Sequence, residues 1–235
     1  TCGVLTLGNT GGTNTFISAS AASIINAHSV TITGAAGTIV DLNDLTFNLT
    51  AESDWDDSSF LGTWTALTSG IINVNGTTTP TLDTNHTLYD LNLADTVVLN
   101  IVASSVLTVR NVDIGPSDNT TELITGDIDA TISGTLTGAG KLTASGITTG
   151  HTLDLNGDVT VNEVISPASA GTFTVAGNWN VANYGNTGST LVFDGVNTDL
   201  TSTGEDLGNI EISKAAPGNI LELQDTYTST GSITI

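Results

Sequence analysis

Basic residues are almost absent from this chain of 235 residues, in which Arg110, Lys141 and Lys214 are the only Lys and Arg. They stand against 24 Asp and Glu residues, so the formal net charge is −21 at pH 7. Binding to nucleic acid and to anionic membrane surfaces depends on clustered Lys and Arg. The charge therefore argues against nucleic acid as a partner and against association with anionic membranes.

Cysteine and long apolar runs are scarce as well. Cys2 is the single cysteine, so the chain cannot form an internal disulfide, and we expect this residue to be buried in a first strand. No run of about 18 apolar residues occurs, which predicts that the chain does not insert into a membrane. No segment has the pattern of a signal peptide, and the few trypsin sites favour a location outside the cell.

The residues that replace the missing charges are Thr, Ser, Asn and Gly, beside 38% hydrophobic residues. Thr favours the half-buried surface of a sheet, whereas Gly and Asn favour turns that need positive φ. Residues that favour helices, such as Lys, Arg and Met, are few or missing. The composition predicts an all-β fold with a substantial core.

Short apolar strands alternate with Gly or Asn-Gly turns over much of the chain. The segment TISGTLTGAGKLTASGITTGHTLDLNGDVTVNEV, residues 131–164, shows this pattern most clearly. Strands this short are unstable as isolated hairpins, but they are stable when each stacks on the equivalent strand of the next coil. The pattern predicts a parallel β-solenoid (β-helix), with tandem β-sandwich domains as the alternative.

Two parts of the chain, residues 62–114 and 177–235, are similar to each other. GTWTALTSGIINVNG (62–76) corresponds to GNWNVANYGNTGSTLVFDG (177–195), and the insertions between them fall in turns. A structural repeat behaves in this way. We therefore expect one elongated β-rich unit over residues 1–235 that contains this internal repeat.

The repeat leads to different predictions for the three tryptophans. Trp64 and Trp179 occupy corresponding positions, which predicts that both rings are buried in the core. Trp55 lies outside the repeat, so it is the better candidate for a surface contact.

The motifs GNW (177–179), VFDG (192–195) and NIEI (209–212) resemble a tandem repeat of very large secreted surface proteins of bacteria and archaea. The segment TCGVLTLGNTGGTNTFISA (1–19) is similar to the first coils of right-handed parallel β-helix proteins of the pectate-lyase-like superfamily. Such resemblances imply β-solenoid segments that serve as stalks, adhesins or surface layers more often than as enzymes.

Asp54, Asp56 and Asp57 form the densest acidic cluster, in the stretch ESDWDDSS. Hard cations bind clustered carboxylate oxygens, so these residues are candidate calcium ligands. The cluster lacks the D-x-[DN]-x-[DN]-G order of a known calcium loop, and a solvated loop is the competing interpretation. No cofactor other than calcium is expected.

The remaining polar residues give no catalytic set. Asp127 and Asp129 would lie on one face of a strand, as a carboxylate pair for glycoside hydrolysis requires, but Asp is common in turns. His28, His86 and His151 stand alone, without the spacing of metal ligands. We therefore expect no catalytic residues and no enzymatic activity.

Four asparagines begin an Asn-x-Thr motif and are candidates for N-glycosylation: Asn48, Asn75, Asn85 and Asn119. Glycosylation would agree with an extracellular location or a place on the cell surface.

The leading functional hypothesis is a structural extracellular protein, a self-assembling subunit of a filament, surface layer or stalk. The apolar strands CGVLTL (2–7) and GSITI (231–235) have two explanations: the chain is a segment of a longer solenoid, or it pairs with copies of itself. We favour pairing between copies, because unpaired strand edges are templates for another strand. One alternative is a carbohydrate-binding or adhesive module of a larger cell-surface adhesin, with surface glycans as partners. The other alternative is a polysaccharide-active β-helix enzyme.

Overall fold

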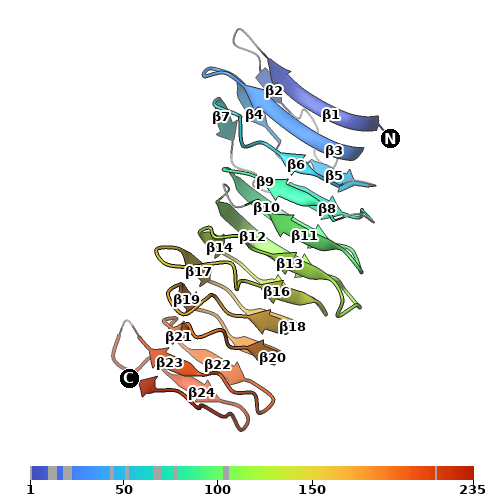
Figure 1. The fold of residues 1–235 in the computed structure, drawn as a ribbon. Coiled ribbons are helices and arrows are strands. Elements are labelled where there is room, and N and C mark those ends of the chain that lie inside the picture. Colours follow the sequence, from blue (N-terminus) through green and yellow to red (C-terminus); the bar gives the residue numbers. More distant parts are fainter. Residues whose placement is uncertain are drawn as a thin grey trace.

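A computed structural model of the protein describes residues 2–9, 15–17, 23–42, 45–50, 53–65, 70–76, 79–102, 106–214 and 216–235. This part of the chain contains no helix, and its strands form a parallel β-solenoid of about 9 turns (Figure 1). The N- and C-terminal residues lie at opposite ends of an elongated stack. The all-β and β-solenoid predictions are therefore confirmed, and the tandem β-sandwich alternative is wrong.

Each coil places up to three short strands on three faces of the solenoid. In one central coil these are β14 (Ala130–Ile132), β15 (Leu136–Thr137) and β16 (Lys141–Thr143). Each pairs in parallel with the corresponding strands of the coils before and after. We name these three the first, second and third face.

The strands of each face follow one another along the stack. The first face contains β2 (Thr15–Ile17), β4 (Ile39–Asp41), β7 (Thr63–Thr65), the first halves of β10 (Thr87–Leu93) and β12 (Leu107–Ile114), β14, β17 (Thr152–Leu155), β19 (Thr172–Val175), β21 (Thr190–Phe193), β23 (Asn209–Ile212) and β25 (Ile233–Thr234). The second face contains the first half of β3 (Ile24–Gly34), β5 (Thr46–Leu49), β8 (Ile71–Val74), the second halves of β10 and β12, β15, the first halves of β18 (Val159–Ile165) and β20 (Trp179–Gly185), β22 (Thr198–Thr201) and β24 (Leu221–Leu223). The third face contains β1 (Cys2–Asn9), the second half of β3, β6 (Trp55–Asp56), β9 (Thr81–Asp83), β11 (Val98–Ile101), β13 (Glu122–Ile124), β16 and the second halves of β18 and β20.

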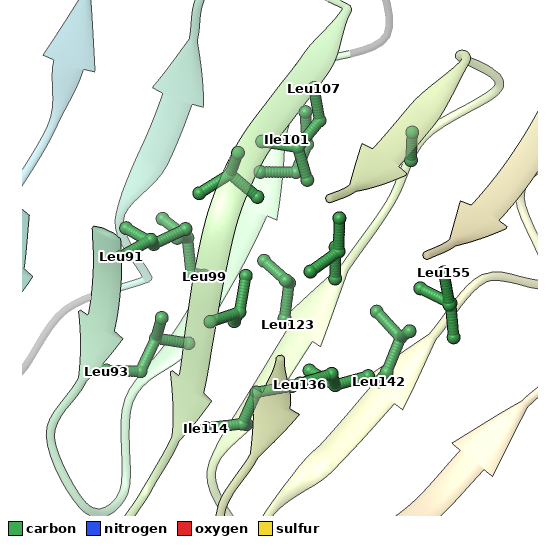
Figure 2. Packing of buried hydrophobic residues seen from close by; sticks show 14 of the residues in the cluster. Leu91, Leu93, Leu99, Ile101, Leu107, Ile114, Leu123, Leu136, Leu142 and Leu155 are labelled. Carbon is green, nitrogen blue, oxygen red and sulfur yellow. The ribbon is translucent and has the colours of Figure 1, made fainter. Parts of the chain in front are cut away.

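The register between coils places similar side chains on top of one another. One apolar column on the second face consists of residues that are each at most 1% exposed: Phe47, Ile72, Leu91, Val112, Leu136, Val159, Trp179 and Leu200. Figure 2 shows part of the interior, where Leu91, Leu99 and Leu123 pack with side chains from neighbouring coils. Because every second residue of a strand points inward, two- to four-residue strands suffice to build this core.

Glycine allows the close approach of successive coils at the turns. A Cβ on Gly177, in the GNW motif, would lie 2.1 Å from the carbonyl carbon of Gly157 in the preceding coil. No side chain fits at that distance. The Asn-Gly and Gly-Asn turns of the sequence therefore reflect backbone packing between coils.

The tryptophan predictions have different outcomes. Trp179 is 1% exposed, as predicted, but Trp55 is also 1% exposed, so the predicted surface contact of Trp55 is wrong. Trp55 points inward because it lies in the third-face column between Val30 and Leu82. The side chains of Trp64 and Cys2 lie outside the described residues.

The unit that recurs in the register is the single coil. For example, 19 residues separate Asn73 from its partner Asn92, and 27 separate Asp54 from Thr81. Trp64 lies in β7 on the first face, whereas Trp179 lies in β20 on the second. The matching positions of these two tryptophans in the sequence therefore fall on different faces of the solenoid.

Candidate functional site

The acidic cluster of the ESDWDDSS stretch is divided between surface and core. Asp54 Oδ1 accepts hydrogen bonds from N and Oγ1 of Thr81 at 2.9 and 3.0 Å, one coil later. Asp56 Oδ1 accepts bonds from N and Oγ of Ser58 at 3.1 and 2.8 Å, while Asp57 points into the core. Among the described residues, no group of three or more His, Cys, Asp or Glu is placed to hold a metal ion. The calcium interpretation thus stays a prediction without a convergent set of ligands.

Asp57 is the only buried carboxylate in the described part of the chain. Its Oδ2 accepts hydrogen bonds from Trp55 Nε1 at 2.8 Å and from Thr84 Oγ1 at 2.9 Å. Its Oδ1 accepts a bond from the backbone N of Asn85 at 3.2 Å and lies 3.0 Å from Nδ1 of His86. These five residues, which we term the Asp57 cluster, join two successive coils through one carboxylate.

A buried carboxylate bound to Nδ1 fixes the orientation of an imidazole, as it does in catalytic dyads. Beside the Asp57 cluster, the buried ring of Phe60 lies against His86 with 5.5 Å between the ring centroids. Asp57 and Phe60 of one coil thus pack directly against His86 of the next coil. Since a buried polar group must be hydrogen-bonded, the arrangement supports the register of these coils.

Sequence reasoning treated His86 as an isolated residue and missed this cluster. Asp57 and His86 are 29 residues apart and lie in successive coils of the solenoid. The sequence holds one indication of the cluster: side chains of a strand point alternately to its two sides, so Asp57 lies on the same side as Trp55, two residues before it. Without the register, however, this alternation does not show which side faces the core.

Asp127 and Asp129 are both bonded to the following coil. Asp127 Oδ1 accepts bonds from N and Oγ1 of Thr148 at 2.7 and 2.8 Å, and Asp129 Oδ1 accepts a bond from N of Thr152 at 2.8 Å. The hydrogen bonds from Thr148 lower the pKa of Asp127. A general acid in glycoside hydrolysis needs a raised pKa, so Asp127 is shifted in the opposite direction.

The bonding of Asp127 to Thr148 is one case of a recurrent arrangement that we term the inter-coil clamp. In each clamp, an Asp or Asn side chain accepts both the N–H and the hydroxyl of a Thr or Ser one coil later. Clamps join Asp54 to Thr81, Asp95 to Ser117, Asn111 to Thr135, Asp127 to Thr148, Asp206 to Thr230 and Asn209 to Ser232. They satisfy backbone N–H groups near strand ends, where the ladder alone leaves donors without a partner.

The clamps also affect the acidity of their carboxylates. Hydrogen bonds from Ser117 lower the pKa of Asp95, and hydrogen bonds from Thr230 lower the pKa of Asp206. Hydrogen bonds to the ionised form favour that form. The sequence does not reveal this role of the acidic residues, because each clamp depends on the register between coils.

Two of the scarce cations are paired with carboxylates on the surface. Nη2 of Arg110 lies 2.6 and 2.9 Å from the two oxygens of Asp90, and the guanidinium lies 3.5 Å from the centroid of the Tyr89 ring. Nζ of Lys141 lies 3.1 Å from Oε1 of Glu122. These pairs link neighbouring coils and leave little positive charge for the recognition of an anionic substrate.

The candidate glycosylation residues differ in their surroundings. Asn75, Asn85 and Asn119 are exposed. The side-chain amide of Asn48 is hydrogen-bonded on both sides by asparagines of the neighbouring coils. A glycan on Asn48 would break these bonds, so the exposed asparagines remain the better candidates.

Two cavities lie at opposite ends of the described solenoid. The cavity near the N-terminal coils has a volume of about 310 Å³ and is lined by Thr6, Leu7, Gly8, Phe16, Thr33, Thr38 and Val40. The cavity in the C-terminal coils has a volume of about 330 Å³ and an apolar lining of Leu200, Ile210, Ile212, Leu221, Leu223, Tyr227, Ile233 and Ile235. The second lining contains no charged group.

Comparison of the chain with protein-family models, with curated proteins and with solved structures finds no match. In the described part of the chain, no helix is long and apolar enough to cross a membrane. Inference about function therefore depends on the geometry of the solenoid itself.

Proposed function

We propose that this chain is a structural protein of the cell exterior, an elongated subunit of a filament, surface layer or stalk without catalytic activity. The observation that carries the proposal is the use of polar side chains between coils. Clamps, the Asp57 cluster and the surface ion pairs connect successive coils, whereas a catalytic site needs such groups to converge on a substrate. A solenoid held together in this way is a rigid spacer.

The proposal includes contact between copies through the strands at residues 2–7 and 231–235. Around the C-terminal cavity, apolar side chains are exposed, with Leu223 and Ile233 each at 48%. At the other end, β1 pairs with β3 and with no other described strand. Parallel strand edges and apolar side chains are what a further coil would cover.

Such a contact would be heterologous, because the two ends of the stack are different surfaces. A heterologous contact gives a filament unless the rotation closes a ring. The net charge of −21 would oppose lateral association of the acidic sides, whereas β1 and the lining of the C-terminal cavity have no charged side chain. The charge distribution thus favours axial over lateral assembly.

The test is analytical ultracentrifugation combined with electron microscopy at high protein and high salt concentration. We expect end-to-end oligomers, and we expect Leu223→Lys or deletion of residues 1–7 to give folded monomers. Val196→Lys is the matched control, since Val196 is 65% exposed in the turn after β21. A full-length chain that stays monomeric under these conditions would contradict the assembly part of the proposal.

The carbohydrate-binding alternative depends on exposed aromatic rings. Trp55 and Trp179 are both buried, so neither provides a surface for stacking on a sugar. A glycan array together with a hydrolysis screen separates the alternatives. Specific binding or turnover would replace the structural proposal.

A further inference from the structure

A row of asparagines follows the outer side of the second face. Asn26, Asn48, Asn73 and Asn92 occupy equivalent positions in successive coils. Nδ2 of each of the last three donates to Oδ1 of the asparagine before it, at 2.9 Å for Asn48, 2.8 Å for Asn73 and 3.0 Å for Asn92. We term these four residues the Asn ladder.

The Asn ladder has a direction. The amide nitrogens of Asn48, Asn73 and Asn92 point toward the preceding coil, and the oxygens of Asn26, Asn48 and Asn73 accept from the next asparagine. The amide of Asn92 has the same orientation, so its oxygen faces the following coil. A donor at the next position would extend the ladder by one bond.

The residue at that next position is Asp113, which pairs in register with Asn92. A protonated carboxyl group is a donor, but an ionised carboxylate offers acceptors alone. An ionised Asp113 would therefore place an acceptor opposite the Asn92 oxygen. On its other side, Asp113 pairs with Thr137, which has no charge.

The negative charge of Asp95 also favours the protonated form of Asp113. Asp95, in the turn after β10, is held in its ionised form by the clamp to Ser117. Arg110 is paired with Asp90 farther along the same two strands. Partial burial and the negative charge of Asp95 raise the pKa of Asp113.

We propose that Asp113 is the proton-dependent end of the Asn ladder: protonated Asp113 donates to Oδ1 of Asn92, and ionisation removes this bond. The consequence is a defined dependence on pH. Because the pKa of Asp113 is higher in the folded chain than in the unfolded chain, the contribution of Asp113 to stability is full below the unfolded value. It is lost as the pH rises through the folded value.

The test compares Asp113→Asn with the wild-type chain, because an asparagine here can donate at every pH. We expect Asp113→Asn to raise Tm by about 2 °C or more at pH 7, and the difference to vanish near pH 3. Asp199→Asn is the matched control, since it removes one exposed carboxylate from the second face outside the Asn ladder. General effects of acid on the other carboxylates occur in both chains and cancel in the difference.

Two further measurements make the outcome decisive. In an Asn92→Ala background, Asp113→Asn should lose its advantage, because the acceptor has gone. An NMR titration should give Asp113 a pKa above the ordinary value of 3.8. If the amides run in the opposite direction, Asn92 donates to an ionised Asp113. The pKa of Asp113 is then lowered and Asp113→Asn is destabilising, which would overturn the proposal.

Discussion

The coils around Trp55 and around Trp179 bury the same large side chain in two different ways. Trp55 packs edge-on against Phe47, with 5.2 Å between ring centroids, and its indole N–H is bonded to Asp57. Trp179 packs against Phe173, Tyr184 and Phe193 at 6.0, 5.8 and 6.4 Å. Its indole N–H has no hydrogen-bond partner among the described residues.

The comparison shows two ways to stabilise a buried indole ring: hydrogen bonds that require one register between coils, and apolar contacts that require only the right volume. The Trp55 site needs a buried carboxylate, which in turn needs donors from Thr84, Asn85 and His86 of the next coil. The hydrogen bonds of these polar groups form together in one register only, because a shifted coil would leave buried groups without partners. The Trp179 site fills its space with rings, and apolar contact tolerates other side chains of similar volume.

Removal of the Trp179 ring should have the largest effect on the stability of the fold. We expect Trp179→Ala to lower the free energy of unfolding by about 3–5 kcal/mol, as truncations of large core aromatics do. Chemical denaturation followed by circular dichroism measures the change. Val196→Ala, at an exposed position, is the control. A loss below about 0.5 kcal/mol for Trp179→Ala would place the ring outside the core.

Conservative substitutions isolate the hydrogen bond that distinguishes the two sites. Trp55→Phe and Trp179→Phe remove similar volume, but only the first removes a donor to Asp57. We expect Trp55→Phe to cost about 1–3 kcal/mol more than Trp179→Phe, because it leaves the buried carboxylate with one bond fewer. Equal losses in denaturation experiments on the two variants would show that the bond contributes nothing.

Acid should weaken the inter-coil clamps, several of which lie outside both tryptophan sites. Asp95, Asp127 and Asp206 have a pKa below the ordinary value of 3.8 in the folded chain, owing to bonds from Ser or Thr. Their contribution to stability is therefore full above pH 3.8 and is lost as the pH falls through the lowered values. Urea denaturation between neutral and acidic pH measures this loss. The dependence should be reduced in Asp127→Asn, which keeps an acceptor oxygen without the titration.

The smallest effect is expected for a surface ion pair that belongs to neither site. Lys141 and Glu122 are partly exposed, with 3.1 Å between Nζ and Oε1. We expect Lys141→Gln to change the free energy of unfolding by no more than about 1 kcal/mol, and less at high salt. A larger loss that persists in high salt would mean that Lys141 contributes through packing rather than charge.

Local patterns in the sequence were sufficient to predict the type of fold. Short strands with Gly and Asn-Gly turns, as in residues 131–164, cannot be stable alone, so they predicted a stack of coils. The burial of Trp179 was also predicted, from its position in the internal repeat. The same reasoning failed for Trp55, which lies outside the repeat and yet is buried as deeply as Trp179.

The candidate site could not be predicted, because its parts are separated by one coil. Asp57 meets His86, and Asp127 meets Thr148, only after the register has been set. Coil lengths vary along the chain, so the sequence offers no constant spacing from which to find these pairs. A shift of one residue would turn each side chain to the other side of the strand.

The sequence by itself determined that this protein is all-β, acidic and built from stacked short strands, because composition and alternation act within a few residues. The tertiary structure alone decided which carboxylate is buried, which carboxylates clamp neighbouring coils, and where the Asn ladder meets Asp113. The physical reason is that hydrogen bonding and desolvation depend on distances of a few ångströms. Those distances are fixed when one coil packs on the next.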